Sequence, residues 1–136
     1  MTPDEAREFL RQNHRAVLAT YRRDGRPQMS PVLATVDGQG RVMISTREAA
    51  VKVRNLRRDR RASLCVMKDG FFGDWVQVEG EAEIVALPEA MELLVDYYRR
   101  IVGEHADWDD YRAAMERDKR VVVRFPVERA GPNVAG

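Results

Sequence analysis

The chain has 136 residues, of which 44% are hydrophobic and 33% are charged, proportions typical of a single folded domain over residues 1–136 with a real core. The formal net charge is only +1, which argues against a dedicated nucleic-acid-binding protein, and no apolar run is long enough for a membrane span. One cysteine excludes an intramolecular disulfide, no pattern of ligands predicts a metal site, and the expected location is the cytoplasm.

The first 21 residues predict a short amphipathic helix followed by a strand. Thr2-Pro3-Asp4-Glu5 has the pattern of a capping box with proline at the first helical position, and the helix should end near Asn13. Residues 15–21 (RAVLATY) are apolar and β-branched enough for a strand with both faces largely covered. We therefore expect the chain to enter its sheet directly after this helix.

A hairpin turn at residues 23–25 leads into a second strand over residues 28–36. Pro27 and Pro31 cannot donate to a strand ladder, so this strand should be an edge, or bulged, near them. The interrupted ladder leaves main-chain groups free for a ligand, although a bulged edge strand without a ligand explains the prolines at least as well. The candidate ligand contacts on this strand are Gln28, Met29, Ser30 and Pro31.

The third predicted strand, residues 41–47, runs into a basic helix over residues 49–58. Such a strand-to-helix junction offers unpaired main-chain N–H groups and the positive end of the helix dipole, which together suit a phosphate. Lys52 or Arg47 would add charge-assisted hydrogen bonds worth roughly 1.5–3 kcal/mol each. We interpret the junction as the phosphate site of a cofactor.

The same stretch has a plainer interpretation, because a run of charges on a helix is usually a solvated face. A solvated face accounts for the four later arginines, Arg57, Arg58, Arg60 and Arg61. It accounts less well for the cluster where the strand meets the helix, Ser45, Thr46, Arg47 and Lys52. A nucleic-acid site is disfavoured because the stretch has no interleaved aromatic residues.

The second half of the sheet begins with a fourth strand, residues 62–69, and an aromatic-glycine loop at residues 70–73. Residues 75–87 then alternate apolar and polar side chains as a half-buried strand does. Gly80 in the middle predicts a sharp bend of the kind that a barrel strand needs. Trp75 is either an ordinary core or interface indole or a wall for a planar ring, and its spacing does not decide between them.

The C-terminal part adds two helices and a last strand. Pro88 should start a helix that Gly103 ends, and Asp107 should cap a second helix. A sixth strand follows at residues 121–127, and residues 130–136 form a loose tail. This order predicts a mainly β chain with helices (α+β), folded as a small, mostly antiparallel six-stranded barrel with flanking helices.

Catalytic side chains cannot be assigned from this sequence. It has no Ser-His-Asp arrangement, glycine-rich nucleotide loop or zinc pattern. Cys65 lies in an apolar run without a neighbouring base, so we expect it to be inert core. If the protein is an enzyme, a bound organic cofactor must carry the chemistry.

Five segments, in order, resemble a known family. They are AVLAT, DGRPQMSPV, KVRNLRRDRRAS, WVQVEGEAEI and YYRRIVGEHADWDDYRAAM, and together they cover nearly the full length. In their order and spacing they resemble the split β-barrel flavin- and deazaflavin-binding proteins related to pyridoxamine 5'-phosphate oxidase (the FMN-binding split-barrel type). The last segment is most similar to the branch that uses coenzyme F420.

The resemblance implies a homodimer with two cofactor sites at the subunit interface. Lys52 and Asn55, with the backbone at Ser45 and Thr46, would hold the cofactor phosphate and ribityl chain. In full, the expected cofactor-binding residues are Gln28, Met29, Ser30, Pro31, Ser45, Thr46, Arg47, Val51, Lys52, Asn55, Trp75, Val76 and Gln77.

Two further features follow from the resemblance. The strand around Pro31 would border the isoalloxazine-like ring, and residues 75–77 would reach in from the partner subunit. Relatives often carry an arginine two positions before the lysine, where this chain has Ala50, and Arg47 would compensate from three residues upstream.

The expected activity is that of a coenzyme F420-dependent reductase, which transfers a hydride from the reduced deazaflavin to a small organic acceptor. The alternatives are an FMN-dependent oxidoreductase or flavin reductase, and a non-enzymatic cofactor carrier, sensor or storage protein of the same fold. Oxidation of vitamin B6 is not expected, because the Arg-x-His element of authentic pyridoxamine phosphate oxidases is missing from this sequence.

Overall fold

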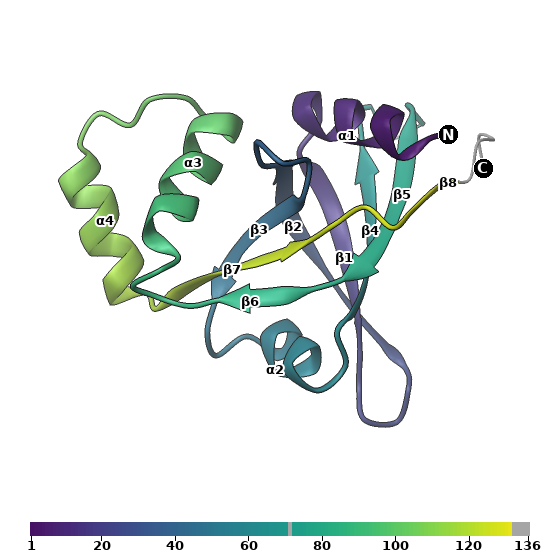
Figure 1. Cartoon of the computed structure of the whole chain (residues 1–136), viewed down its shortest axis with the longest axis horizontal. Coiled ribbons are helices and arrows are strands. Elements are labelled where there is room, and N and C mark those ends of the chain that lie inside the picture. Colours follow the sequence, from purple (N-terminus) through teal and green to yellow (C-terminus); the bar gives the residue numbers. More distant parts are fainter. Residues whose placement is uncertain (71, 132–136) are drawn as a thin grey trace.

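The computed structural model describes residues 1–70 and 72–131, which form one curled antiparallel sheet with helices around it (Figure 1). The strands are β1 (Arg15–Tyr21), β2 (Pro27–Val36), β3 (Val42–Arg47), β4 (Arg61–Met67), β5 (Trp75–Glu81), β6 (Glu83–Val85), β7 (Arg120–Phe125) and β8 (Arg129–Gly131). The helices are α1 (Pro3–Gln12), α2 (Val51–Arg58), α3 (Met91–Ile101) and α4 (Trp108–Arg117). Across the sheet the order is β6-β7-β3-β2-β1-β4-β5-β8. This is the predicted barrel with flanking helices, built from eight described strands instead of six.

Helix α1 lies across one end of the barrel (Figure 1), and its limits match the prediction. The Thr2 hydroxyl accepts a hydrogen bond from the Glu5 N–H at 3.1 Å, and the Glu5 carboxylate accepts one from the Thr2 N–H at 3.1 Å. These two bonds complete the capping box. Ala6 and Leu10 are fully buried in the barrel core, which fixes the helix on the sheet.

The two additional strands lie where we expected one long strand and a loose tail. Residues 75–87 are divided at Ala82, so that β5 pairs with β4 while β6 pairs with β7. The tail begins as strand β8, in which Ala130 lies opposite Val78. The predicted tail was therefore wrong at its start, because three residues are too few to show alternation. Residues 132–136, and Phe71 of the predicted loop, lie outside the described part of the chain.

Gly80 marks the point at which the barrel closes. A Cβ atom on this buried residue would lie 2.2 Å from the Pro126 carbonyl oxygen and 2.9 Å from a ring carbon of Phe125. Only glycine permits the backbone that follows β7 to approach β5 so closely. Gly80, at which we predicted a bend, thus allows the segment after β7 to cross β5.

The barrel is open between β2 and β3. Strand β2 pairs with β1 over residues 27–33, but with β3 only over residues 34–36. The half of β2 that carries both prolines therefore has a free edge, as predicted, and its pairing with β1 is continuous. Strand β3 pairs instead with β7, up to Arg47 opposite Arg120.

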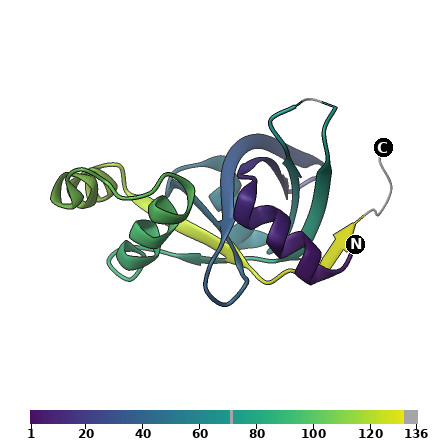
Figure 2. The same ribbon diagram turned by 90° about the horizontal axis from the view of Figure 1, so that it is seen from above.

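Two hydrophobic clusters fill the interior. The larger one occupies the barrel, and the smaller one packs β3 and β7 against α3 and α4, which stand to one side (Figures 1 and 2). Asp107 caps α4 as predicted. Helix α3 begins at Met91, not at Pro88, because residues 87–90 form a turn. None of the helices in the described ranges is long and apolar enough to cross a bilayer.

Candidate functional site

A cavity of about 480 Å³ lies where β2 and β3 part, and we call it the split cavity. Val32 of β2 lines it on one side, the junction between β3 and α2 lines it on the other, and Arg120 of β7 contributes as well. Five of the predicted cofactor residues line this cavity: Pro31, Ser45, Thr46, Arg47 and Lys52. The opening of the barrel therefore joins the predicted phosphate junction to the proline-bearing strand.

The split cavity holds two cations that lack a counter-charge. Lys52 and Arg120 are both half-buried, and neither has an ion pair with any described residue. Burial, and then the charge of Arg120, lower the pKa of Lys52. Like charges in a partly desolvated place cost free energy until an anion neutralises them. This arrangement therefore has the chemistry that suits an anion.

The first turn of helix α2 borders the same cavity. Its N-cap residue, Ala50, offers no side chain to the free N–H groups of the first turn. The Ala50 carbonyl accepts from the N–H groups of Val53 at 3.1 Å and Arg54 at 3.3 Å, so the helical hydrogen bonds begin there. The N–H groups of the two preceding residues, Val51 and Lys52, have no partner within the helix and are available to an anion.

Two further polar groups, one on β2 and one beside it, lie outside the residues that line the split cavity. The Ser30 hydroxyl is buried, and within the described residues it has no hydrogen-bond partner. Tyr97 of α3 donates a hydrogen bond to the Leu33 carbonyl at 2.8 Å, on the free edge of β2. Burial raises the pKa of Tyr97, which keeps its hydroxyl protonated and donating at neutral pH. Tyr97 therefore holds the free edge of β2, and the buried Ser30 hydroxyl is a polar group that the described chain leaves unpaired.

Arg47, which we expected to compensate for Ala50, is more exposed than Lys52 and has an acidic neighbour. Its side chain is 63% exposed and lies 4.0 Å from the Asp118 carboxylate. It lines the cavity, but its charge is shared with Asp118 and with solvent.

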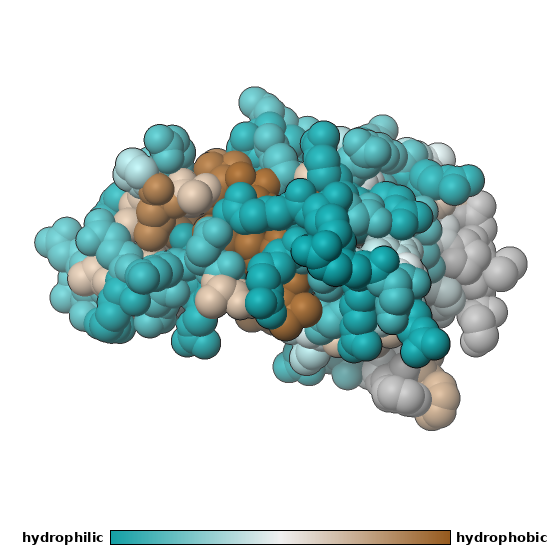
Figure 3. Space-filling model, turned by 90° about the horizontal axis from the view of Figure 1, so that it is seen from below, coloured by the Kyte–Doolittle hydropathy of each residue, from teal (hydrophilic) through white to brown (hydrophobic). Residues whose placement is uncertain are grey.

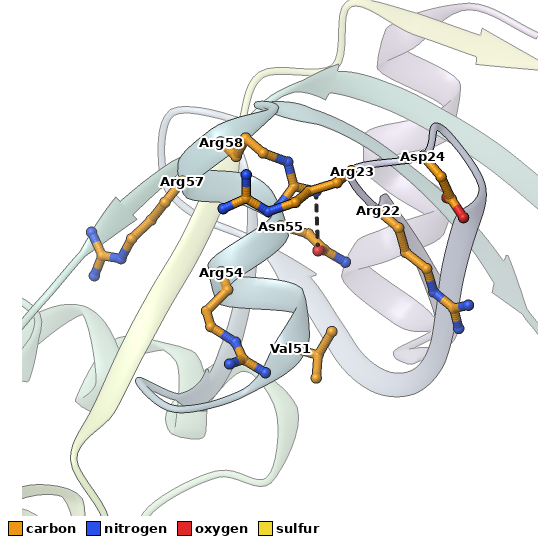
Figure 4. Close-up of a pocket in the computed structure, with 8 residues that line it drawn as sticks. All are labelled: Arg22, Arg23, Asp24, Val51, Arg54, Asn55, Arg57 and Arg58. Atoms are coloured by element: carbon orange, nitrogen blue, oxygen red, sulfur yellow. Dashed lines mark hydrogen bonds between the residues drawn. The ribbon is translucent and has the colours of Figure 1, made fainter.

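A second cavity, of about 760 Å³, lies on the other side of α2, and we call it the arginine groove. The β1–β2 hairpin lines it with Arg22, Arg23 and Asp24, and α2 lines it with Val51, Arg54, Asn55, Arg57 and Arg58 (Figure 4). All five arginines are exposed. Arg57 pairs with Glu48 at 2.5 Å, and Arg58 donates to the Tyr21 carbonyl at 2.5 Å. The solvated-face interpretation therefore describes this side of the helix.

Asn55 and Val51, both expected at the cofactor, line the arginine groove and not the split cavity (Figure 4). Asn55 is 5% exposed, its amide donates to the Thr20 hydroxyl at 3.1 Å, and its carbonyl accepts from Arg58 at 3.3 Å. The Thr20 hydroxyl in turn donates to the Gln28 side chain at 3.4 Å. This chain of bonds ties α2 to the hairpin, so within one subunit Asn55 and Gln28 act as structural residues.

Residues 75–77 lie away from the split cavity within one subunit, because β1 and β4 separate β5 from β2. Val76 is fully buried in the barrel core. Trp75 lies opposite Met67, and the Gln77 amide donates to Glu79 at 2.7 Å. Trp75 and Gln77 are half-buried on the outer face of the sheet. There they could contact only a cofactor that is held by a second molecule packed against this face.

This outer face is largely apolar along β2. The strand pairings place Pro31, Val17, Cys65 and Gln77 side by side across four strands. On the same face of β2, Met29 is 63% exposed and Leu33 is 46% exposed. Cys65 thus lies on the outer face, and the expectation that it belongs to the core was wrong, although burial still raises the pKa of its thiol.

Sequence reasoning missed Arg120 and Tyr97. Both reach the site through tertiary pairing, Arg120 through β7 beside β3 and Tyr97 through α3 over β2. No local pattern marks either of them, because each is brought near the junction by an element that is distant from it in the sequence. In the part of the chain that the structure describes, no group of His, Cys, Asp and Glu could hold a metal ion.

The residues of the split cavity fit a ligand that carries a phosphate. Two unneutralised cations, free N–H groups and β3 hydroxyls supply what a phosphate binds. The free edge of β2 and its apolar outer side chains supply a boundary for a planar ring. The geometry thus suits a molecule with an anionic tail and a flat body.

Comparison with known proteins gives consistent results. Residues 2–132 match the family described as pyridoxamine 5'-phosphate oxidase. A conserved hypothetical protein of Mycobacterium tuberculosis is similar in structure, with 31% sequence identity and a TM-score of 0.77 over 96% of this chain and 82% of that one.

Two more distant structures share the fold alone. A heme-binding protein of Mycobacterium smegmatis has 23% identity and a TM-score of 0.68, over 94% of this chain and 52% of that one. A protein described as an F420 reductase has 21% identity and a TM-score of 0.69, over 91% of this chain and 94% of that one.

Proposed function

Because this chain belongs to the pyridoxamine 5'-phosphate oxidase family of split-barrel proteins, which bind flavin-type cofactors, we propose that it is a coenzyme F420-dependent reductase. In this proposal it transfers a hydride from the reduced deazaflavin to a small organic acceptor in the cytoplasm. The observation that carries the proposal is the split cavity, in which the β3–α2 junction and Lys52 adjoin the free edge of β2. The fold shared with an F420 reductase supports the choice of cofactor.

The residues of the junction would hold the cofactor phosphate. Lys52 supplies a half-buried charge, Ser45 and Thr46 line the cavity from β3, and the first turn of α2 supplies N–H groups. A charge-assisted hydrogen bond from Lys52 would contribute roughly 1.5–3 kcal/mol. Binding energy from this remote group would orient the reactive ring.

The free edge of β2 would border the ring. Pro31 has no N–H, and the neighbouring main-chain groups on this edge have no partner strand, so they are available to ring heteroatoms. Seen from the side on which α2 lies, apolar side chains form patches left of the centre and at the lower centre of the view, with hydrophilic ones around and between them (Figure 3). An amphipathic cofactor would match such a surface.

When bound, the reduced cofactor supplies the hydride to an electrophilic acceptor. The protein's own residues bind and orient the cofactor through the junction and limit the access of water along β2. Tyr97 holds the β2 edge through its bond to the Leu33 carbonyl. No side chain is assigned as a proton donor, and water would protonate the acceptor.

We further propose that a second copy of the chain covers the outer face of β2, β1, β4 and β5. The alternating exposure of β2 leaves its outward side chains apolar, with Met29 and Leu33 prominent among them. In a homodimer formed there, Trp75 and Gln77 of the partner could complete the site at the split cavity. Each cofactor would then lie at the subunit interface.

The dimer can be tested through its apolar face. Leu33→Glu should convert a dimer into a monomer in light scattering coupled to size exclusion, because a charge would enter a desolvated interface. Arg22→Glu, on the exposed hairpin, is the control that changes charge without touching this face. A wild-type protein that is monomeric at all concentrations would overturn this part of the proposal.

Cofactor binding is the direct test of function. Purified protein should be titrated with coenzyme F420 and with FMN while ligand fluorescence is followed, and the loaded, reduced protein should then be offered quinones, nitro compounds and enones. Tight binding of FMN alone would replace the deazaflavin by a flavin and make the protein an FMN oxidoreductase or flavin reductase. Binding without turnover of any acceptor would favour a carrier or sensor.

A further inference from the structure

We infer that Tyr97 is a positioning residue for the split cavity: its hydroxyl takes the place of the next pair in the β2–β3 ladder and so keeps the two strands apart. This inference rests on the proposed function, in which the split cavity holds the cofactor. Tyr97 is not among the residues that line the cavity, and it acts through the main chain of the strands that do.

The end of the β2–β3 ladder shows where pairing would continue. The last pair on the open side is Ala34 with Ile44. One step further along the same register, Leu33 would lie opposite Ser45. The Ala34 N–H donates to the His14 carbonyl at 2.8 Å, so the main-chain groups of Ala34 face β1. Because main-chain groups alternate between the two sides of a strand, those of Leu33 face β3 and would form a hydrogen-bonded pair with Ser45.

The Tyr97 hydroxyl occupies the place of this pair. It donates to the Leu33 carbonyl at 2.8 Å. Burial raises the pKa of Tyr97, and a hydrogen bond from the Ser45 main chain to the same oxygen offsets part of that rise. One hydroxyl thus stands between the carbonyl of Leu33 and the N–H of Ser45, which would otherwise bond to each other.

Helix α3 supports the tyrosine from the β3 side of the opening. Leu94 and Val95 of α3 are buried in the smaller hydrophobic cluster together with Met43 of β3, and Tyr97 packs against this cluster. The Tyr111 hydroxyl of α4 donates to the Leu94 carbonyl at 2.8 Å and ties the two helices together. The Tyr97 hydroxyl therefore reaches β2 from a support that is packed on β3.

Continued pairing of the two strands would close the split cavity. The residues that the next pairs would join line the cavity from both sides: Pro31, Val32, Ser45, Thr46 and Arg47. Pro31 does not prevent the first step, because its missing N–H lies two residues beyond Leu33. The group that stops the ladder is thus the hydroxyl of Tyr97, and the space for a ligand begins where the ladder stops.

The first test removes the hydroxyl and keeps the ring. In Tyr97→Phe, the Leu33 carbonyl and the Ser45 N–H lose their common partner, and we expect them to bond to each other. The following pair, Val32 and Thr46, would then be a non-hydrogen-bonded pair, in which the two Cα atoms lie close together. In nuclear magnetic resonance spectra, an Overhauser contact between the Hα atoms of Val32 and Thr46 should be present in Tyr97→Phe and absent in the wild type.

The second test measures binding. FMN and coenzyme F420 should be titrated into the wild type, Tyr97→Phe and Tyr111→Phe, with ligand fluorescence as the readout. For the cofactor that the wild type binds, Tyr97→Phe should raise the Kd by roughly fivefold, because the ligand must first break the new ladder bond.

Tyr111→Phe is the matched control. It also removes a tyrosine hydroxyl that donates to a main-chain carbonyl, but this bond lies between the two helices and away from β2. The control should lower the Tm, and it should leave both the Kd and the Hα contacts of Val32 as they are in the wild type. The Tm of Tyr97→Phe shows whether that variant is folded.

The outcomes separate this inference from the proposed function. Weaker binding without the new Hα contact would make the hydroxyl a direct ligand contact and overturn the inference. An unchanged Kd would overturn it as well, whether or not the contact forms. If the wild type binds neither FMN nor coenzyme F420, the proposed function fails, and the Hα contact in Tyr97→Phe still decides whether the hydroxyl separates the strands.

Discussion

The two sides of helix α2 hold their cations in opposite ways. On the arginine groove, five arginines are exposed to solvent, and two of them are held by Glu48 and the Tyr21 carbonyl (Figure 4). On the split cavity, Lys52 and Arg120 are half-buried, and the described chain gives them no counter-charge. We propose that the side with fewer positive charges is the better anion site.

If the split cavity binds the cofactor phosphate as proposed, desolvation and the lack of a partner mark a binding site better than the number of charges does. Exposed cations are screened by water, and their interactions contribute little. A half-buried cation without a partner has already lost part of its hydration, so a bound anion restores more free energy to it. The following predictions test this difference between the two sides.

The largest effect is expected for Asn55, whose hydrogen bonds on the groove side of α2 stabilise the fold. Asn55→Ala should lower the free energy of unfolding by about 1–3 kcal/mol, because Thr20 and Arg58 lose a buried partner. Equilibrium denaturation in urea measures this change. Flavin affinity should fall less than about threefold, equivalent to less than about 0.7 kcal/mol. A large loss of affinity with unchanged stability would instead support Asn55 as a cofactor ligand, as the family resemblance implies.

The next effect concerns Lys52 on the cavity side. Lys52→Ala should weaken binding of a phosphate-bearing flavin by roughly tenfold or more, about 1.4 kcal/mol. The stability of the ligand-free protein should not fall, because the substitution removes the repulsion from Arg120. Fluorescence titration and a thermal melt give the two values. Unchanged affinity would extend the solvated-face interpretation to this side of the helix.

The pH dependence of binding should report the same two charges. For FMN, whose phosphate is a monoester that becomes a monoanion below pH 6, affinity should fall by roughly fivefold by pH 5. At alkaline pH affinity should fall again, before pH 10.5 is reached, because burial and Arg120 lower the pKa of Lys52 in the free protein. Riboflavin, titrated over the same range, is the control and should show neither limb.

The depressed pKa of Lys52 also has a consequence for stability. The folded, ligand-free protein binds fewer protons at this site than the unfolded chain does between the lowered pKa and 10.5. The contribution of Lys52 to stability therefore rises with pH through that window, and at neutral pH it is a cost. Lys52→Met should remove this rise from the pH profile of Tm.

The smallest effects are expected in the arginine groove. Arg54→Ala and Arg57→Ala should each change flavin affinity by less than about twofold, since exposed cations contribute little. The matched comparison is Lys52→Ala, two residues from Arg54 on the same helix. If Arg54→Ala weakened binding as much as Lys52→Ala does, the distinction between the two sides would be wrong.

Local signals in the sequence predicted the elements well. The capping box of α1, the turn at residues 23–25 and the Asp107 cap of α4 depend on neighbouring residues, and all are found in the structure. The prolines of β2 correctly predicted a free edge. Strand β8 was not predicted, because it is short and forms only by pairing with β5, which is distant in the sequence.

The site was predictable only in part, for the same reason. The junction residues Ser45, Thr46, Arg47 and Lys52 were predicted because a strand meets a helix within a few positions, and the structure places them around one cavity. The orientation of α2 on the barrel decides which side of the helix each residue faces. In this orientation Asn55 and Val51 line the arginine groove. Arg120 enters through the pairing of β7 with β3, which no local pattern contains.

The free edge of β2 has one more effect, on how the protein behaves at high concentration. An unpaired strand edge is a template to which a foreign strand can add, and this is a common beginning of aggregation. Pro27 and Pro31 both lie in the unpaired half of β2, where a missing N–H interrupts any intermolecular ladder. The two prolines thereby disfavour the addition of a foreign strand at the opening of the barrel.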